Sequence, residues 1–260
     1  MATHISARQT QFSYFDQVLG MPVWKGSKIL DFGGNVGGFL ANSEDHVDHD
    51  DYWCLDVCHG AIAQGRRDFP RAHFVFYNRY SSYFNPNGVR SFPVPDLGLQ
   101  FNVILAFSVF SHTHLTEMLD LVEQLRQMLL PDGVLAFTFI DPSYDRSQND
   151  LTLPSGSGVI PGFDGLRAEK LSSEMTDRVE NGRQPGWCVE VDDALYIEPG
   201  DDLCQQELTV TSYCSYFTTD YMMRLFPDAS VHPPISPEWQ HCCVLKNTGR
   251  PGYEKLRRSL

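Results

Sequence analysis

The sequence has no run of about 20 apolar residues and few basic residues for its length. A membrane-spanning helix needs about 20 consecutive apolar residues, so we expect none. The 260-residue chain carries 20 Lys and Arg against 33 Asp and Glu, a formal net charge of −13. Such a surface repels phosphate backbones and anionic lipid headgroups. We therefore expect neither a nucleic-acid partner nor a membrane partner.

Metal-ligand and disulfide patterns are also missing. The chain has seven cysteines, but they form neither a Cys-x-x-Cys pair nor a Cys/His spacing typical of zinc. The first residues lack the basic and apolar regions of a secretory signal. We expect no metal site, and we expect reduced, partly buried thiols in a cytoplasmic protein.

Short apolar segments alternate with helical patterns through the first half of the chain. The predicted strands span 28–32, 51–57, 73–77, 101–107 and 134–140. Helices are predicted at 7–20, from 37–43, at 59–69 and at 116–130, the last of them clearly amphipathic. Continuous apolar strands separated by helices indicate a parallel sheet covered on both faces. A later helix at 218–226 and strands near Val231 and at 241–246 complete the prediction.

The pattern changes after residue 141. Residues 142–210 are rich in turn formers and contain one predicted hairpin, 187–191 with 195–198. We interpret them as a cap insertion over the carboxyl ends of the strands, inside a single domain that spans 1–260. Residues 1–25 carry several aromatic side chains. They are predicted to form either a helical lid over the site or a helix packed against the sheet.

The most informative motif is a glycine cluster, DFGGNVGG at 31–38, between a predicted strand and a helix. Glycine lets the backbone turn sharply and lets a ligand approach, and the helix that follows points free N–H groups at that ligand. Asp56 ends the next strand, where a carboxylate can accept both hydroxyls of an adenosine ribose. The Gly-x-Gly-x-x-Gly fingerprint of nicotinamide enzymes would need glycine at Asn35.

With an acid before its glycines, the chain resembles the class I S-adenosylmethionine-dependent methyltransferases of the small-molecule type. Further matches follow in order: Asp56 after the second strand, Asn78 after the third, FSVFSH at 107–112 after the fourth and LLPDG at 129–133 before the fifth. The family usually has glycine where Asn35 stands, and asparagine tolerates left-handed backbone. The resemblance covers 28–141 well and 216–246 loosely.

The resemblance implies a fold and a set of binding residues. The fold is a doubly wound α/β structure with a mainly parallel seven-stranded sheet, an antiparallel last strand and helices on both faces. The residues implied to contact S-adenosylmethionine are Asp31, Gly33, Gly34, Asn35, Gly37, Asp56, Val57, Asn78, Arg79, Phe107 and Ser108. We expect Tyr14, Trp24, Asp141 and Tyr144 to contact the acceptor.

The implied reaction is methyl transfer to a small molecule, with an oxygen nucleophile and a role in secondary metabolism as the expectation. His112 is the candidate general base, because histidine titrates near neutral pH; alternatively, it only hydrogen-bonds the cofactor or a loop. A nicotinamide-dependent oxidoreductase, a non-catalytic methyltransferase-like binding protein and a cofactor-binding cyclase stay open as other functions.

Overall fold

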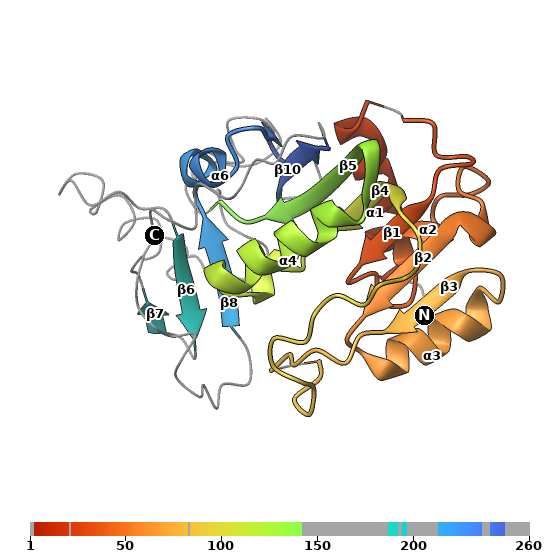
Figure 1. The fold of residues 1–260 in the computed structure, drawn as a ribbon, viewed down its shortest axis with the longest axis horizontal. Helices are drawn as coiled ribbons and strands as arrows, with labels where there is room; N and C mark the ends of the chain where they lie inside the picture. The colour runs from red at the N-terminus through yellow and green to blue at the C-terminus, as the bar shows by residue number, and fades with distance from the viewer. Residues whose placement is uncertain are drawn as a thin grey trace.

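The computed structural model describes residues 3–20, 22–82, 84–141, 187–191, 194–196, 213–235 and 240–247. In these ranges the main sheet has seven strands in the order β3-β2-β1-β4-β5-β10-β9 (Figure 1). They are β1 (Ile29–Phe32), β2 (Tyr52–Asp56), β3 (His73–Phe76), β4 (Phe101–Ala106), β5 (Leu129–Phe139), β9 (Ser230–His232) and β10 (His241–Lys246). The first five pair in parallel, and β10 is antiparallel to both of its neighbours. The predicted fold is confirmed.

Helices cover both faces of this sheet, because successive residues of a strand point to opposite sides. Ile29 packs with α1 (Thr3–Val18), α2 (Gly38–Ala41) and α3 (His59–Asp68). Leu30 packs on the other side with α4 (Leu115–Gln127) and α6 (Thr219–Leu225). Two 3-10 helices, η1 (His49–Asp51) and η2 (Phe110–His112), complete the described helices. None of them has both the length and the apolar character that crossing a membrane requires.

The start of β5 differs from the sequence prediction. The expected turn at 131–133 is a bulge inside the strand, because the register with β4 shifts between Phe101 and Val103. Asp132 takes a left-handed φ of 64° there, and its N–H donates to the carbonyl of Asn247 at 3.1 Å. The helix expected to end at residue 130 ends at Gln127, because the next residues already belong to the strand.

A second, antiparallel sheet of three strands lies beside the N-terminal end of α4 in Figure 1. Its strands are β6 (Trp187–Val191), β7 (Ala194–Tyr196) and β8 (Tyr213–Phe217), and the predicted hairpin is confirmed by pairing of Val191 with Ala194. The rest of the predicted insertion lies outside the described residues. The hydroxyl of Ser215 donates to the carbonyl of Thr113 at 2.7 Å, which joins β8 to the segment before α4.

Candidate functional site

A cavity of about 350 Å³ opens at the carboxyl ends of the parallel strands. Ligands of α/β sheets bind at this edge, and the volume suits a small molecule. Its walls come from the segments after β1, β2, β3 and β4, with further residues from α1 and α4: Gln11, Phe32, Gly33, Asn35, Leu55, Asp56, Val57, Tyr77, Arg79, Tyr80, Ser81, Phe84, Phe107, Ser108, Val109, His112, Thr113, Glu117 and Leu121.

The glycine turn after β1 requires its residue types. Gly33, Asn35 and Gly37 take left-handed φ values of 78°, 54° and 84°, which suit glycine and are tolerated by asparagine. A Cβ on Gly34 would lie 2.5 Å from Cγ of Asp31, so this position must also lack a side chain. Gly33 and Asn35 form part of the cavity wall.

Asp56 lies at the end of β2 with its carboxylate already oriented. Oδ2 accepts a hydrogen bond from the N–H of Asn35 at 2.8 Å, and Oδ1 accepts one from the N–H of Cys58 at 2.6 Å. Burial raises the pKa of Asp56, although these backbone bonds act in the opposite direction. Each carboxylate oxygen has two acceptor positions, so the group can also bind the hydroxyls of a ligand in the cavity.

Asp31 lies behind the glycine turn, and its side chain contacts the core. It is 4% exposed and accepts a hydrogen bond from the hydroxyl of Tyr52 at 2.5 Å. Burial raises the pKa of Asp31 to about 7; the bond from Tyr52 opposes this rise and the charge of Asp56 adds to it. Asp31 therefore supports the turn from behind and does not line the cavity, and its contact with the cofactor stays a prediction.

The segment between β4 and α4 supplies five residues of the cavity wall, Phe107, Ser108, Val109, His112 and Thr113. Ser108 takes a left-handed φ of 55°, and its N–H donates to the hydroxyl of Thr138 in β5 at 2.7 Å. Val109 packs so tightly on the glycine turn that a Cβ on Gly33 would lie 2.4 Å from it. His112 is exposed at the end of η2. The candidate base thus shares one cavity with seven of the predicted cofactor residues: Gly33, Asn35, Asp56, Val57, Arg79, Phe107 and Ser108. The other four, Asp31, Gly34, Gly37 and Asn78, do not line that cavity.

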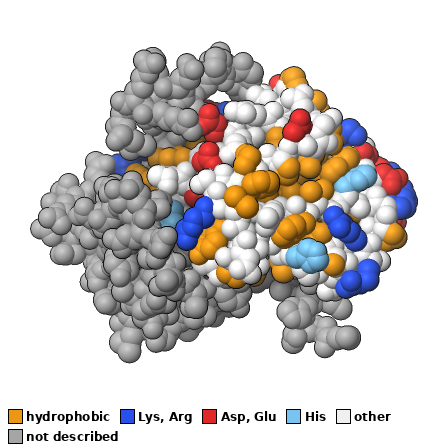
Figure 2. Space-filling view, turned by 60° about the horizontal axis from the view of Figure 1, so that its bottom comes forward, with side chains coloured by type: hydrophobic (Ala, Val, Ile, Leu, Met, Phe, Trp, Pro, Cys, Tyr) orange, Lys and Arg blue, Asp and Glu red, His pale blue; other side chains and the backbone are white. Residues whose placement is uncertain are grey.

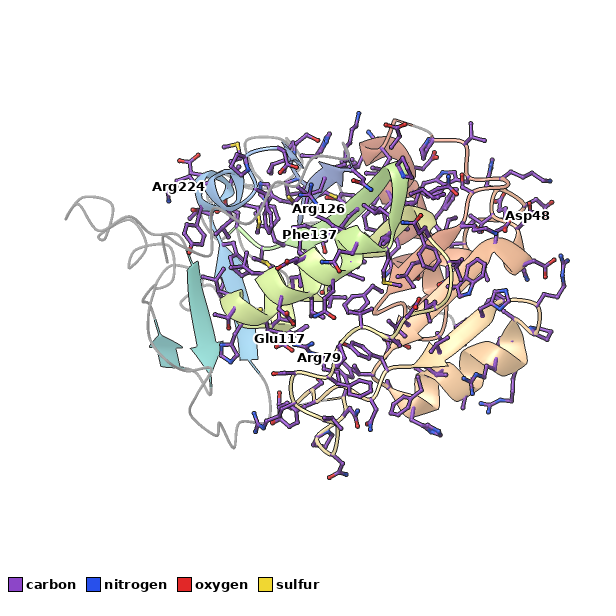
Figure 3. The ribbon with its side chains drawn as sticks, viewed as in Figure 1. Asp48, Arg79, Glu117, Arg126, Phe137 and Arg224 are labelled. Atoms are coloured by element: carbon purple, nitrogen blue, oxygen red, sulfur yellow. The ribbon has the colours of Figure 1, made fainter. Side chains whose placement is uncertain are left out.

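Arg79 forms an ion pair across the cavity wall. Figure 3 shows Arg79, from the loop after β3, and Glu117, from α4, pointing toward each other. Nε of Arg79 donates to Oε1 of Glu117 at 2.8 Å, and Nη1 donates to the carbonyl of Phe92 at 2.9 Å. Burial lowers the pKa of Arg79, but the charge of Glu117 and the bond to Tyr77 outweigh it and raise the pKa overall. Arg79 therefore ties the loop to α4.

The loop after β3 also presents apolar side chains to solvent. Phe84, Val89 and Phe92 are all exposed. Figure 2 turns the lower side of the Figure 1 view forward, and hydrophobic side chains gather near the centre of that face with charged side chains around them. Asn78, predicted to contact the cofactor, is exposed at the start of this loop and accepts a bond from Asn85 at 3.2 Å.

The residues predicted to contact the acceptor have other partners in this structure. The Tyr14 hydroxyl donates to the carbonyl of Gln240 at 2.9 Å, and Nε1 of Trp24 donates to Asp16 at 2.7 Å. Both rings lie in the core cluster on the α1 face of the sheet. Asp141 accepts bonds from the N–H and hydroxyl of Thr219 at the start of α6, at 2.7 and 2.8 Å. Tyr144 lies outside the described residues.

Several cavity residues were not predicted from the sequence. Gln11 reaches the cavity from α1, and Glu117 and Leu121 reach it from α4. Tyr80 and Phe84 come from the loop after β3. The aromatic residues of this loop, Tyr80, Tyr83, Phe84 and Phe92, were the available signal in the sequence. Nothing in the sequence distinguished Gln11 from other polar residues on its helix.

The part of the chain that forms most of this site matches a known protein family. Residues 30–135 match the family described as "Methyltransferase domain". This segment of the chain is therefore similar to a methyltransferase domain. The matched segment runs from β1 into β5 and includes the glycine turn, Asp56 and the turn at Ser108. The predicted family, the enzyme class and S-adenosylmethionine as cofactor are confirmed.

Solved structures share the fold of this methyltransferase domain at low sequence identity. The glycopeptide N-methyltransferase MtfA complexed with sinefungin has a TM-score of 0.52 and 13% identity over 91% of this chain and 92% of its own. CalS10, an amino pentose methyltransferase from Micromonospora echinaspora, has a TM-score of 0.51 and 13% identity over 94% and 92%. DesVI of Streptomyces venezuelae has 0.50 and 15% over 92% of each chain. No protein of curated function matches the sequence.

Proposed function

We propose that this methyltransferase transfers the methyl group of S-adenosylmethionine to an oxygen nucleophile of a small-molecule acceptor in secondary metabolism. One observation carries the proposal: the glycine turn, Asp56 and His112 contact the same cavity. CalS10 is an amino pentose methyltransferase involved in calicheamicin biosynthesis, and MtfA is a glycopeptide N-methyltransferase. Similar folds thus act on small molecules, which supports an acceptor of this size.

The wall of the cavity fits the chemical parts of the cofactor. Asp56 offers carboxylate oxygens to the two hydroxyls of a ribose. Leu55 and Val57 flank it with apolar side chains suited to an adenine ring. Gly33 and Asn35 bring backbone close to the cavity without bulky side chains, as a methionine chain requires. When bound, S-adenosylmethionine supplies a methyl group that the positive sulfur makes reactive.

The protein contributes alignment, electrostatics and proton transfer. The carboxylate of Asp56 favours a positively charged ligand, whereas the charge of Glu117 is balanced by its ion pair with Arg79. Phe107 and Val109 place apolar surface at the cavity and keep water away from the reacting atoms. Alignment of two bound reactants can itself supply a large part of the rate. His112 accepts the proton of the acceptor hydroxyl and, because it is exposed, can release that proton to solvent.

The candidate base His112 in the cavity wall favours an oxygen nucleophile over a nitrogen nucleophile. A neutral amine attacks through its own lone pair, whereas a hydroxyl must lose its proton as the new bond forms. The residues that remain for the acceptor include Tyr80, Phe84 and Thr113, which provide two aromatic rings and two hydroxyls. We therefore propose a planar or apolar acceptor that bears a hydroxyl. The net charge of −13 supports an acceptor that is not a nucleic acid and action away from anionic membranes.

A calorimetric titration followed by a turnover panel tests this function. The protein is titrated with S-adenosylhomocysteine, NAD and NADP, then assayed for S-adenosylhomocysteine release with phenols, aliphatic alcohols, carboxylic acids and amines. Binding of S-adenosylhomocysteine and O-methyl products by mass spectrometry are expected. Turnover confined to amines would refute the oxygen nucleophile. Binding without any turnover would favour the non-catalytic alternative, and dinucleotide binding alone would favour the oxidoreductase.

A further inference from the structure

Ser108 has a backbone conformation that serine rarely adopts. Its φ of 55° lies in the left-handed region, where a Cβ is crowded by the neighbouring carbonyl. Such a conformation persists in a protein when the surrounding structure imposes it. Since Ser108 lies at the cavity wall, whatever holds its backbone also determines the shape of the proposed site.

Two buried side chains from distant parts of the sequence hold this backbone. The N–H of Ser108 donates to Oγ1 of Thr138, and the hydroxyl of Thr138 donates to Oε1 of Gln240, both at 2.7 Å. Thr138 and Gln240 are almost fully buried. A hydroxyl has one proton. Because Gln240 accepts that proton, the oxygen of Thr138 keeps its lone pairs directed at the N–H of Ser108.

The bonded chain extends from the turn to the N-terminal helix. The hydroxyl of Tyr14 in α1 donates to the main-chain carbonyl of Gln240 at 2.9 Å. The ring of Tyr14 also packs edge-on against Phe107, with 6.2 Å between ring centroids. One network of buried groups thus joins α1, β5, the residue before β10 and the turn after β4.

The same turn positions the candidate base. The hydroxyl of Ser111 donates to the carbonyl of Ser108 at 3.2 Å, and the N–H of His112 donates to the carbonyl of Val109 at 2.9 Å. These short-range bonds make residues 108–112 one compact unit. A shift of the Ser108 backbone therefore shifts both the predicted cofactor contact and His112.

We propose that Thr138 and Gln240 are positioning residues for methyl transfer: they hold the left-handed turn at Ser108 in the conformation that the bound cofactor and the acceptor require. Neither residue belongs to the cavity wall, so they act through Ser108. This inference rests on the proposed function, because the turn matters for catalysis through the ligands that it contacts.

The test compares Thr138→Val, which keeps the shape and removes the hydroxyl, with Thr138→Ser, which restores it. Ser43→Ala is the matched control, since Ser43 is fully buried and its hydroxyl donates to Leu40 at 2.9 Å in another part of the core. For each protein we measure amide hydrogen exchange over 107–112 without ligand, S-adenosylhomocysteine affinity, kcat, KM and the thermal midpoint.

We expect Thr138→Val to accelerate exchange over 107–112 and to lower kcat or S-adenosylhomocysteine affinity about 10-fold to 100-fold, as a misplaced reacting group does. Thr138→Ser should recover most of this loss. Ser43→Ala should lower the thermal midpoint and leave affinity and kcat unchanged. If Thr138→Val does not fold, Gln240→Met, which frees the Thr138 hydroxyl to rotate, takes its place with the same expected direction.

Three results separate this inference from the proposed function on which it rests. Wild-type protein that binds no S-adenosylhomocysteine would overturn the proposed function. Wild-type binding and turnover, together with equal values for Thr138→Val, would overturn the positioning role alone. Equal losses in Thr138→Val and Ser43→Ala, in proportion to their lower stability, would also overturn it, because they would show a general effect on folding.

Discussion

The main-chain N–H of Asn35 donates a hydrogen bond to Oδ2 of Asp56 at 2.8 Å. This bond joins the glycine turn after β1 to the acid at the end of β2, two segments that the sequence separates. The left-handed φ of 54° at Asn35 is the conformation in which the bond occurs. The two parts of the proposed cofactor site are therefore connected by a hydrogen bond within the protein itself.

Replacing Asp56 tests its proposed contact with the ribose. Asp56→Ala removes charge-assisted hydrogen bonds worth about 1.5–3 kcal/mol. At about 1.4 kcal/mol per factor of ten, S-adenosylhomocysteine affinity measured by calorimetry should fall about 10-fold to 100-fold. Asp68→Ala, at an exposed carboxylate on α3, is the control and should bind like wild type. An unchanged affinity in Asp56→Ala would remove the ribose contact from the proposal.

Replacing His112 tests whether it acts as a base. General bases contribute about 100-fold to 10,000-fold, so His112→Ala should lower kcat at pH 7 with little change in S-adenosylhomocysteine affinity. With a phenol as acceptor, the loss should shrink as the pH approaches the pKa of the phenol, because the acceptor then arrives deprotonated. Wild-type kcat at pH 7 in the variant would show that His112 is not the base.

Replacing glycine with alanine should have opposite effects on the stability of the protein at Gly34 and at Gly60. In Gly34→Ala the new Cβ would lie 2.5 Å from Cγ of Asp31 and 2.9 Å from Sγ of Cys54. Both groups are buried, so the variant should lose about 1–3 kcal/mol of unfolding free energy. In Gly60→Ala the new Cβ would meet no atom within 4 Å inside helix α3, and stability should rise by up to about 1 kcal/mol. Urea unfolding measures both; equal stabilities would contradict the packing seen at Gly34.

The buried carboxyl of Asp31 should make stability depend on pH. Its pKa is raised to about 7, chiefly by burial, with Tyr52 and Asp56 as its charged or hydrogen-bonding neighbours. The folded state therefore binds this proton more tightly than the unfolded state does. The contribution of the group to stability is complete below pH 4 and is lost as the pH rises to about 7. In Asp31→Asn, unfolding free energies at pH 5, 6, 7 and 8 should decline less than in wild type; an identical decline would assign the effect to other groups.

Replacing only one member of the ion pair of Arg79 and Glu117 should lower the free energy of unfolding. The Arg79 side chain is 6% exposed, so Glu117→Gln leaves a buried cation with Asp120 at 3.7 Å as the remaining acid. A loss of up to about 3 kcal/mol is expected. The double variant Arg79→Met and Glu117→Gln should lose less than the sum of the single variants, because no buried charge is left unpaired.

The exposed ion pair of Arg71 and Asp50 provides the matched control for the buried pair of Arg79 and Glu117. Asp50→Asn should leave the thermal midpoint of the protein unchanged, because solvent screens an exposed pair. A loss as large as that of Glu117→Gln would show that burial does not set the energetics of these pairs.

The order of strands and helices could be predicted from local patterns because each element carries its own signal. The apolar strands, the amphipathic helix α4 and the glycine turn with Asp56 depend on residues close in sequence. The bulge at Asp132 could not be predicted in this way, since its bond partner, Asn247, lies at the far end of the described chain.

The sequence by itself determined the α/β class, the family and the cofactor, because a short motif with the right spacing specifies a strand, a turn and an acid. Only the tertiary structure decided that Asp31 supports the turn from behind, that Arg79 pairs with Glu117, and that Thr138 and Gln240 hold the backbone of Ser108. Those contacts join residues about 20 to 100 positions apart. Chain folding brings them together, and no local pattern records which distant polar groups will meet in a buried place.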